Sequence, residues 1–290
     1  MSVAGAASLL PLHAARRRCG GRWRYFLEDW TVSHAPSPVV WLATRRRLAE
    51  PGRQGRCLLA ITAGPGENPA VGAFGAGEVE ELAGANAAPF AILRRLPQAN
   101  YLSFYCHGRW NPLNPTLSVL LPTAAPGAHG GDWTDGATTG LTVADFRSVD
   151  LRRSRLAFLW ACESAMIGLR SSFEAIGFPS AMIDAGVPGV IAALWIVEDE
   201  ATRWLAHTAI REHLDRRVAP AAALKAAQIA LITDRAADAG TGGERGARRP
   251  SGAVDTLGAI GVSGPATEPT GVVVPRTAPF FWAGFVMVGA

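Results

Sequence analysis

Short apolar runs along the chain predict a series of buried strands. They cover residues 57–62, 101–106, 156–161 and 189–195, and turn-forming residues 63–66 close the first run. The last three runs contain β-branched or aromatic side chains and are nearly uninterrupted by polar residues. Continuous runs of this kind are typical of parallel strands that are covered on both faces.

Helical patterns separate and follow these strands. Residues 78–82 predict the start of one helix. Further helices are predicted at residues 89–96, 143–146, 173–185, 200–214 and 220–233. Residues 23–32 alternate well enough for a strand or the edge of a hairpin, and residues 280–288 predict a very apolar final strand. The alternation of strands and helices indicates an α/β fold with a mostly parallel sheet.

The same patterning divides the chain into four segments. An arginine- and tryptophan-rich segment, residues 1–50, precedes the predicted core at 51–233. Residues 234–278 are dominated by Gly, Ala, Thr, Pro and Arg without periodicity, which predicts a flexible low-complexity insertion. The final core strand falls within residues 279–290.

Composition excludes several classes of protein. Hydrophobic residues make up 49% of the 290 residues and charged residues 18%, so the chain is not of the disordered, highly charged type. A net charge of +4 with basic residues in short scattered runs gives no clustered stripe for nucleic acid. No stretch reaches the roughly 20 uninterrupted apolar residues of a membrane helix. We therefore expect neither nucleic acid nor membrane as a partner.

The cysteines point to a reducing compartment. Cys19, Cys57, Cys106 and Cys162 are widely spaced, with no CxxC motif and no cluster with metal-ligand spacing. We expect a cytoplasmic protein with reduced thiols, no bound metal and no cofactor. Cys106 falls inside an apolar run, which predicts a core position.

Reactive side chains follow two of the predicted strands. His107 and Gly108 come after the run at 101–106, and Cys162 ends the run at 156–161. Functional groups of parallel α/β sheets collect at the carboxyl ends of the strands. The imidazole can promote the thiolate of Cys162 or protonate a leaving amine. Backbone N–H groups of Gly108 and Cys162 would form an oxyanion hole. Inert packing of a strand-end cysteine remains the alternative at this point.

An ordered set of motifs resembles a known family. The motifs are LLPLHAA (9–15), EVEELA (78–83), FYCHG (104–108), LTVADF (141–146), LWACESA (159–165), GVIAALWIVEDEAT (189–202), ALKAAQ (223–228) and PFFWAGFVMVG (279–289). Together they resemble the CHAT domain, a caspase-like bacterial peptidase domain that is related to separase and usually associated with TPR arrays. The resemblance implies a caspase-like three-layer sandwich, in which a mostly parallel central sheet is flanked by helices. It also implies that residues 1–50 are the N-terminal part of that domain, truncated at the front.

The resemblance further implies a Cys–His dyad peptidase, with Cys162 as nucleophile and His107 as its partner. In separase-like relatives an acidic residue after the tryptophan of the corresponding strand lines the pocket for a basic P1 side chain, the residue just before the cleaved bond. Trp195, Glu198 and Asp199 hold the matching positions, which suggests cleavage after Arg or Lys. For the two acidic residues, a solvated helix start stabilised by the helix dipole is the alternative.

Two alternative hypotheses compete with the assignment as a peptidase. A catalytically silent caspase-like module would use the same surface to bind partners, and a non-proteolytic thiol hydrolase would use the same residues. Under the leading hypothesis the partners are a protein or peptide substrate and a TPR-containing or other regulatory subunit. That hypothesis places a regulated endopeptidase, in need of activation, in bacterial signalling or defence.

Overall fold

A six-stranded sheet forms the centre of the molecule in a computed structural model that describes residues 9–50, 53–63, 67–123, 140–169, 175–233, 246–247, 274–275 and 277–290. Its strands are β3 (Leu58–Thr62), β4 (Val79–Ala83), β5 (Tyr101–Tyr105), β9 (Leu156–Trp160), β12 (Gly189–Ala193) and β15 (Phe285–Gly289). Within these described ranges the spatial order is β15-β12-β9-β5-β3-β4. Every neighbouring pair is parallel except β12 and β15, which confirms the mostly parallel sheet.

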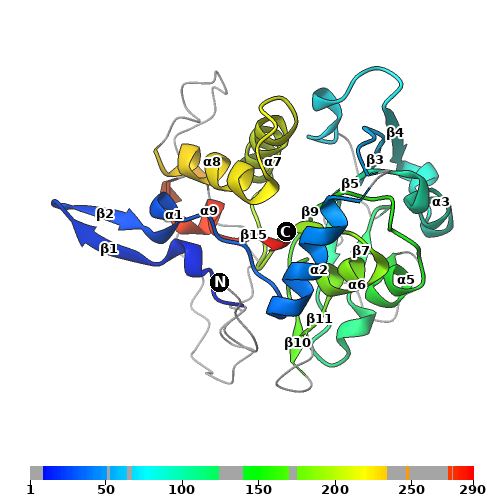
Figure 1. The fold of residues 1–290 in the computed structure, drawn as a ribbon, viewed down its shortest axis with the longest axis horizontal. Coiled ribbons are helices and arrows are strands. Elements are labelled where there is room, and N and C mark those ends of the chain that lie inside the picture. Colours follow the sequence, from blue (N-terminus) through cyan, green and yellow to red (C-terminus); the bar gives the residue numbers. More distant parts are fainter. Residues whose placement is uncertain are drawn as a thin grey trace.

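Helices cover both faces of this sheet (Figure 1). The first face carries α2 (Pro38–Leu48), α3 (Pro89–Arg95), α5 (Val143–Arg147) and α6 (Phe178–Ala185). The second face carries α1 (Phe26–Asp29), α7 (Asp199–Leu214), α8 (Pro220–Ile232) and α9 (Pro279–Trp282). Successive strand side chains point to opposite faces, so Leu59 and Ile61 enter one apolar cluster while Leu58 and Ala60 enter the other. The three-layer sandwich is therefore confirmed.

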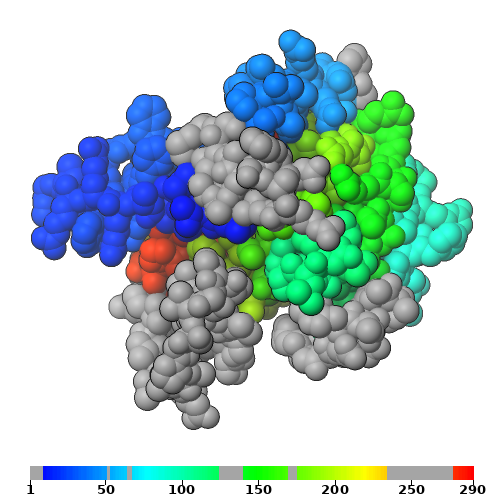
Figure 2. Space-filling model, turned by 90° about the horizontal axis from the view of Figure 1, so that it is seen from below, coloured from blue at the N-terminus to red at the C-terminus, as the bar shows by residue number. Residues whose placement is uncertain are grey.

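Smaller elements surround the core. The short strands are β1 (Arg16–Cys19), β2 (Arg22–Tyr25), β6 (His107–Arg109), β7 (Val119–Leu121), β8 (Leu141–Thr142), β10 (Gly168–Leu169), β11 (Ala175–Ile176), β13 (Gly246–Ala247) and β14 (Val274–Pro275). Short 3₁₀ turns cover Leu12–Ala14, Val71–Ala73, Gly84–Ala87, Leu96–Gln98 and Pro115–Leu117. The ribbon of β1 and β2 projects from the body, as both views show (Figures 1 and 2).

Several elements differ from the sequence prediction. The predicted helix start at residues 78–82 is wrong: residues 79–83 form the edge strand β4, because the backbone of all five residues pairs with β3. The expected hairpin edge at 23–32 turns into α1 at Phe26, and the expected final strand at 280–288 starts with the short helix α9. Pro279 at the first position of α9 fits a helix start. The helix predicted from 173 begins at Phe178.

The predicted insertion at 234–278 lies outside the described residues except for 246–247, 274–275 and 277–278. None of the helices in the described ranges is both long and apolar enough to cross a membrane.

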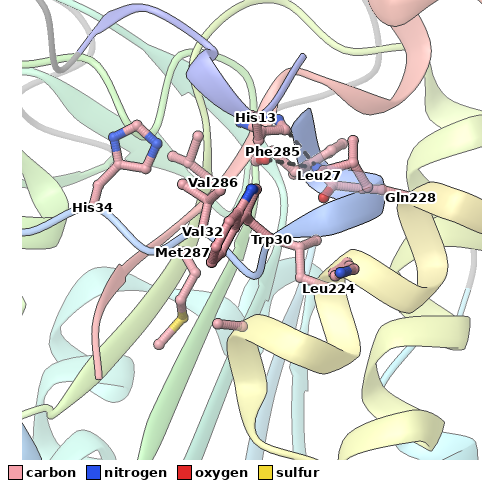
Figure 3. A pocket seen from close by; sticks show the side chains of 12 residues that line it. His13, Leu27, Trp30, Val32, His34, Leu224, Gln228, Phe285, Val286 and Met287 are labelled. Carbon is pink, nitrogen blue, oxygen red and sulfur yellow. Dashed lines mark hydrogen bonds between the residues drawn. The ribbon is translucent and has the colours of Figure 1, made fainter. Parts of the chain in front are cut away.

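The N-terminal segment is attached to the C-terminal strand (Figure 3). The backbone N–H of His34 donates to the carbonyl of Met287 at 2.7 Å, and the N–H of Gly289 donates to the carbonyl of His34 at 2.8 Å. His13 and His34 line a cavity of about 10 Å³ between this segment, α8 and β15. Both ring nitrogens of His34 are buried without a hydrogen-bond partner among the described residues. Burial, followed by the nearby His34, lowers the pKa of His13 to about 4.

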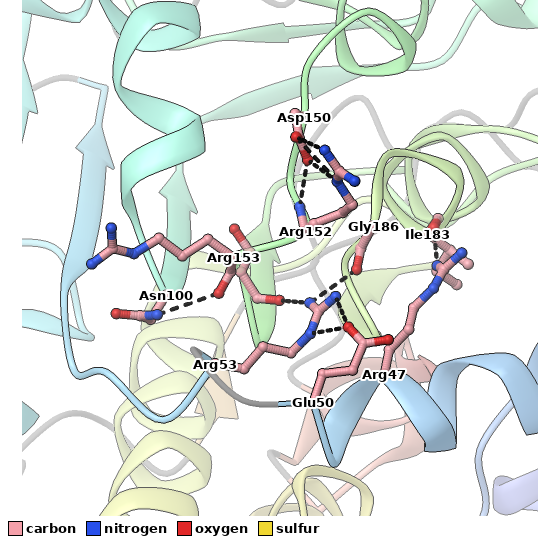
Figure 4. Close-up of polar contacts among 10 residues, drawn as sticks. Arg47, Glu50, Arg53, Asn100, Asp150, Arg152, Arg153, Ile183 and Gly186 are labelled. Atoms are coloured by element: carbon pink, nitrogen blue, oxygen red, sulfur yellow. Dashed lines mark hydrogen bonds and ion pairs between the residues drawn. The ribbon is translucent and has the colours of Figure 1, made fainter.

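A buried arginine links the segments that precede strands β9 and β12 (Figure 4). The side chain of Arg53 is 2% exposed and donates to the carbonyls of Ser154, at 2.5 Å, and Gly186, at 3.1 Å. Its remaining donors pair with Glu50. These carbonyls lie just before β9 and β12, so Arg53 holds the edge of the sheet opposite to the carboxyl ends of the strands.

Candidate active site

The segments that follow β5 and β9 leave the same edge of the sheet. The two strands are parallel neighbours, and their last residues, Tyr105 and Trp160, lie side by side in register. A cavity of about 180 Å³ opens at this edge. Both His107 and Cys162 line it. From their places after the two strands, the sequence predicted only that they lie at the same edge of the sheet.

Strand β6 brings the histidine segment against the cysteine turn. It pairs antiparallel with β7, so that His107 lies opposite Leu121 and Gly108 opposite Leu120. A Cβ atom at Gly108 would lie 2.2 Å from the carbonyl oxygen of Cys162 and 3.3 Å from the Cβ of Ala161. A glycine is needed here because any side chain would collide with the backbone of the cysteine turn.

The turn after β9 is held by buried hydrogen bonds. The hydroxyl of Ser164 donates to the carbonyl of Ala161 at 2.8 Å and accepts the N–H of Ala193 at 3.0 Å. The N–H of Ala165 donates to the carbonyl of Ala193 at 2.7 Å. Cys162 thus sits on a turn that is fixed to the neighbouring strand β12.

The surroundings favour the neutral thiol of Cys162. Burial raises its pKa, and the carboxylates of Glu163 and Asp199 raise it further. The backbone N–H groups of Val197 and of Cys162 itself act in the opposite direction. The neighbouring Cys106 has its pKa raised to about 12, mainly by burial and then by Cys162. At neutral pH the resting site therefore holds protonated thiols.

A polar cluster lines the cavity beside the two reactive residues. The hydroxyl of Tyr105 donates to the carboxylate of Asp199. The guanidinium of Arg203 lies 4.8 Å from the ring centre of Tyr105 and 3.8 Å from Asp199, and it donates to the carbonyl of Glu67 at 2.9 Å. Burial and then Asp199 raise the pKa of Tyr105, so it remains a donor. The carboxylate of Asp199 is thus shared between a phenol and a guanidinium.

The predicted substrate residues lie at different places. Asp199 lines the cavity, whereas Trp195 and Glu198 are not among its lining residues. Glu198 accepts the N–H groups of Glu200 and Ala201 at 3.0 and 2.7 Å as the cap of α7. The indole of Trp195 donates to the carbonyl of Phe280 at 3.1 Å.

Other lining residues could not be assigned from the sequence. They are Ala63, Tyr105, Cys106, Trp160, Val197 and Thr202. Cys106 was assigned to the core; it packs against one core cluster and also lines the cavity. Tyr105 and Trp160 end their strands with the side chains directed to the α7 face, a placement that only strand register reveals. Within the described parts of the chain, no three His, Cys, Asp or Glu side chains are grouped to hold a metal.

The fold and this edge define an α/β protein in which strand β6 and the turn after β9 bring a histidine and a cysteine to one cavity. The chain belongs to the CHAT domain family, because the family model matches residues 1–290. No curated protein sequence matches this chain.

Solved structures show distant similarity. The separase–securin complex of Saccharomyces cerevisiae matches 70% of this chain in two structures, with TM-scores of 0.47 and 0.44 at 13% and 14% identity. A structure described as a protease matches 89% of this chain with a TM-score of 0.47 at 11% identity. The chain covers 13% of each matched separase-complex chain and 53% of the protease chain, so it spans much less than their full length.

Proposed function

We propose that this CHAT domain is a cysteine endopeptidase that hydrolyses peptide bonds of a protein substrate through Cys162 and His107. The observation that carries the proposal is the shared cavity. Both side chains line it, and the glycine after His107 lies against the carbonyl of Cys162. A nucleophile and an acid–base group at one cavity are the minimum that acyl transfer from an amide requires.

In this reaction the sulfur of Cys162 attacks the carbonyl carbon of the scissile bond. His107 takes the thiol proton as the carbon–sulfur bond forms and gives it to the departing amine as the carbon–nitrogen bond breaks, and a thioester remains on Cys162. Water then hydrolyses the thioester and restores the thiol. The backbone N–H groups of Gly108 and Cys162 are proposed to stabilise the oxyanion.

Selectivity for a basic P1 side chain is assigned to Asp199. Its carboxylate lines the cavity, so a substrate Arg or Lys that enters would find an acceptor there. Arg203 already lies 3.8 Å from this carboxylate, so the incoming cation has to compete with it. Trp195 supports the site from outside the cavity through its hydrogen bond to Phe280, and Glu198 fixes the first turn of α7, which carries Asp199.

Activation is part of the proposal because the resting thiol is neutral. A protein partner that reorders the turn around Cys162 would lower the thiol pKa and start catalysis. A TPR-containing or other regulatory subunit is the partner we propose, in the cytoplasm of a bacterium and within signalling or defence.

Fluorogenic peptides that differ only at P1 test this function. We expect cleavage after Arg or Lys, loss of cleavage in Cys162→Ala and His107→Ala, and loss of the basic preference in Asp199→Asn. Equal cleavage of all P1 residues would refute the assignment of Asp199 while leaving the peptidase intact.

A silent interaction module is the second candidate. The raised pKa of Cys162 favours it, because a neutral thiol is a weak nucleophile. The absence of any cleavage, with partner binding unchanged in Cys162→Ala, would establish this alternative.

A further inference from the structure

The residue after Cys162 adopts an unusual backbone conformation. Glu163 has a φ of 56°, in the left-handed region that non-glycine residues rarely adopt. Within the described residues, Arg217 is the only other non-glycine residue with a positive φ. Such a conformation costs on the order of 1 kcal/mol or more and persists where surrounding contacts enforce it.

The contacts of Glu163 join three segments at the carboxyl edge of the sheet. One carboxylate oxygen accepts the N–H of Trp110, the residue after β6, at 3.2 Å. The N–H of Glu163 donates to the carbonyl of Trp195, beyond β12, at 3.2 Å. Its own carbonyl accepts the N–H of Met166 at 3.0 Å. Glu163 is therefore bonded both to the segment that carries His107 and to the end of β12.

The carboxylate is held in a place that disfavours its charge. Burial raises the pKa of Glu163, and the N–H of Trp110 opposes that shift. Its negative charge also raises the pKa of the Cys162 thiol, to which Asp199 contributes in the same direction. The other titratable groups that line the cavity are Tyr105, Cys106 and His107, and the guanidinium of Arg203 lies beside Tyr105 and Asp199. Burial of a carboxylate is unfavourable unless a hydrogen bond offsets it, and here the N–H of Trp110 supplies that bond.

We propose that Glu163 is a positioning residue, whose carboxylate ties the strand carrying His107 to the turn carrying Cys162. The role deepens the proposed function and rests on it. Strand β6 is thus fixed at two points. Gly108, within the strand, lies against the carbonyl of Cys162, and Trp110, the residue after the strand, donates to Glu163. A second consequence is electrostatic, because the charge of the same carboxylate adds to the larger effect of burial in raising the pKa of the Cys162 thiol.

Three substitutions of Glu163 separate the hydrogen bond to Trp110 from the negative charge. Glu163→Gln keeps an oxygen that can accept the N–H of Trp110 and removes the charge. Glu163→Ala removes both, and Glu163→Gly does so in a residue that tolerates a positive φ, which guards against misfolding of the alanine variant. Glu78→Gln is the matched control. The carboxylate of Glu78 also accepts a backbone N–H, that of Gly75 at 2.8 Å, and Glu78 is not among the residues that line the cavity.

Two reagents measure the reactivity of Cys162. Iodoacetamide gives the alkylation rate as a function of pH, and a peptidyl chloromethyl ketone with Arg at P1 gives the rate of substrate-like labelling. Mass spectrometry identifies the modified residue in both cases. We expect all Glu163 variants to react with iodoacetamide roughly threefold faster or more at pH 7, because the thiolate fraction rises as the thiol pKa falls. We expect the peptidyl reagent to label Glu163→Gln at least as fast as the wild type, because the tie is kept and the thiolate fraction rises. The alanine and glycine variants should lose about tenfold or more of that labelling. Glu78→Gln should match the wild type throughout.

Equal peptidyl labelling of the alanine, glycine and glutamine variants would overturn the tie, and an unchanged iodoacetamide profile in Glu163→Gln would overturn the electrostatic role. If the wild type is not labelled by the peptidyl reagent, the proposed function fails separately. The tie is then read from the effect of His107→Ala on the iodoacetamide rate. That effect must persist in the glutamine variant and vanish in the alanine variant, and any other pattern refutes the proposal.

Discussion

Replacing Gly108 by alanine tests how closely the histidine strand and the cysteine turn must approach. The added methyl would lie 2.2 Å from the carbonyl oxygen and 3.2 Å from the carbonyl carbon of Cys162, and 3.3 Å from the Cβ of Ala161. Carbon and oxygen atoms in ordinary contact lie at least 3.4 Å apart. The two segments must therefore separate by about 1 Å, and a misplacement of that size can cost a reaction about a hundredfold.

The atoms that must move belong to backbone on both sides, so no side-chain rotation relieves the contact. We expect Gly108→Ala to reduce the second-order rate of Cys162 labelling by a basic-P1 peptidyl electrophile about a hundredfold. Overpacking should also lower the free energy of unfolding by about 1–3 kcal/mol, measured by urea denaturation.

Gly72→Ala is the control, because a Cβ atom at Gly72 meets no atom within 4 Å. It should leave both the labelling rate and the unfolding midpoint unchanged. A Gly108→Ala variant that labels within threefold of the wild type would refute the close approach of the two segments.

Two further predictions concern stability away from the cavity. Because burial lowers the pKa of His13 from 6.5 to about 4, the unfolded chain binds a proton that the folded chain does not as pH falls between these values. Up to about 3 kcal/mol of the free energy of unfolding should thus be lost as pH falls from 6.5 to 4. In His13→Gln the urea midpoint should depend less on pH across this range. An equal dependence of the midpoint on pH in both proteins would contradict the buried neutral imidazole. Arg53→Met removes the donors to Ser154 and Gly186 and should cost about 3 kcal/mol in urea unfolding, with labelling of Cys162 unchanged in the folded protein. A loss below about 0.5 kcal/mol would show that these carbonyls do not depend on Arg53.

The central strands of the sheet were predictable because they are short and apolar on both faces. β5, β9 and β12 coincide with the runs at 101–106, 156–161 and 189–195 to within two residues. β4 was not predictable, because Glu80 and Glu81 favour a helix in the absence of a neighbouring strand. Its pairing with β3 is a tertiary interaction that no local pattern contains.

The candidate site was predictable in part. The places of His107 and Cys162 after two strands indicated a common edge, since parallel strands end on the same side of a sheet. Two contacts could not be inferred from the sequence. Glu163 accepts the N–H of Trp110, 53 positions away in the chain, and Tyr105 donates to Asp199, 94 positions away. The difference between Asp199, in the cavity, and Glu198, at the helix cap, depends on the start of α7 and needs the structure as well.

The central claim is that Cys162 and His107 act as one catalytic unit. The most direct measurement treats the protein with the basic-P1 peptidyl electrophile and locates the adduct by mass spectrometry, in the wild type and in His107→Ala. We expect an adduct on Cys162 that falls sharply in His107→Ala, with Cys19, Cys57 and Cys106 unlabelled in both proteins. An adduct that is independent of His107, or labelling spread over all four cysteines, would contradict it.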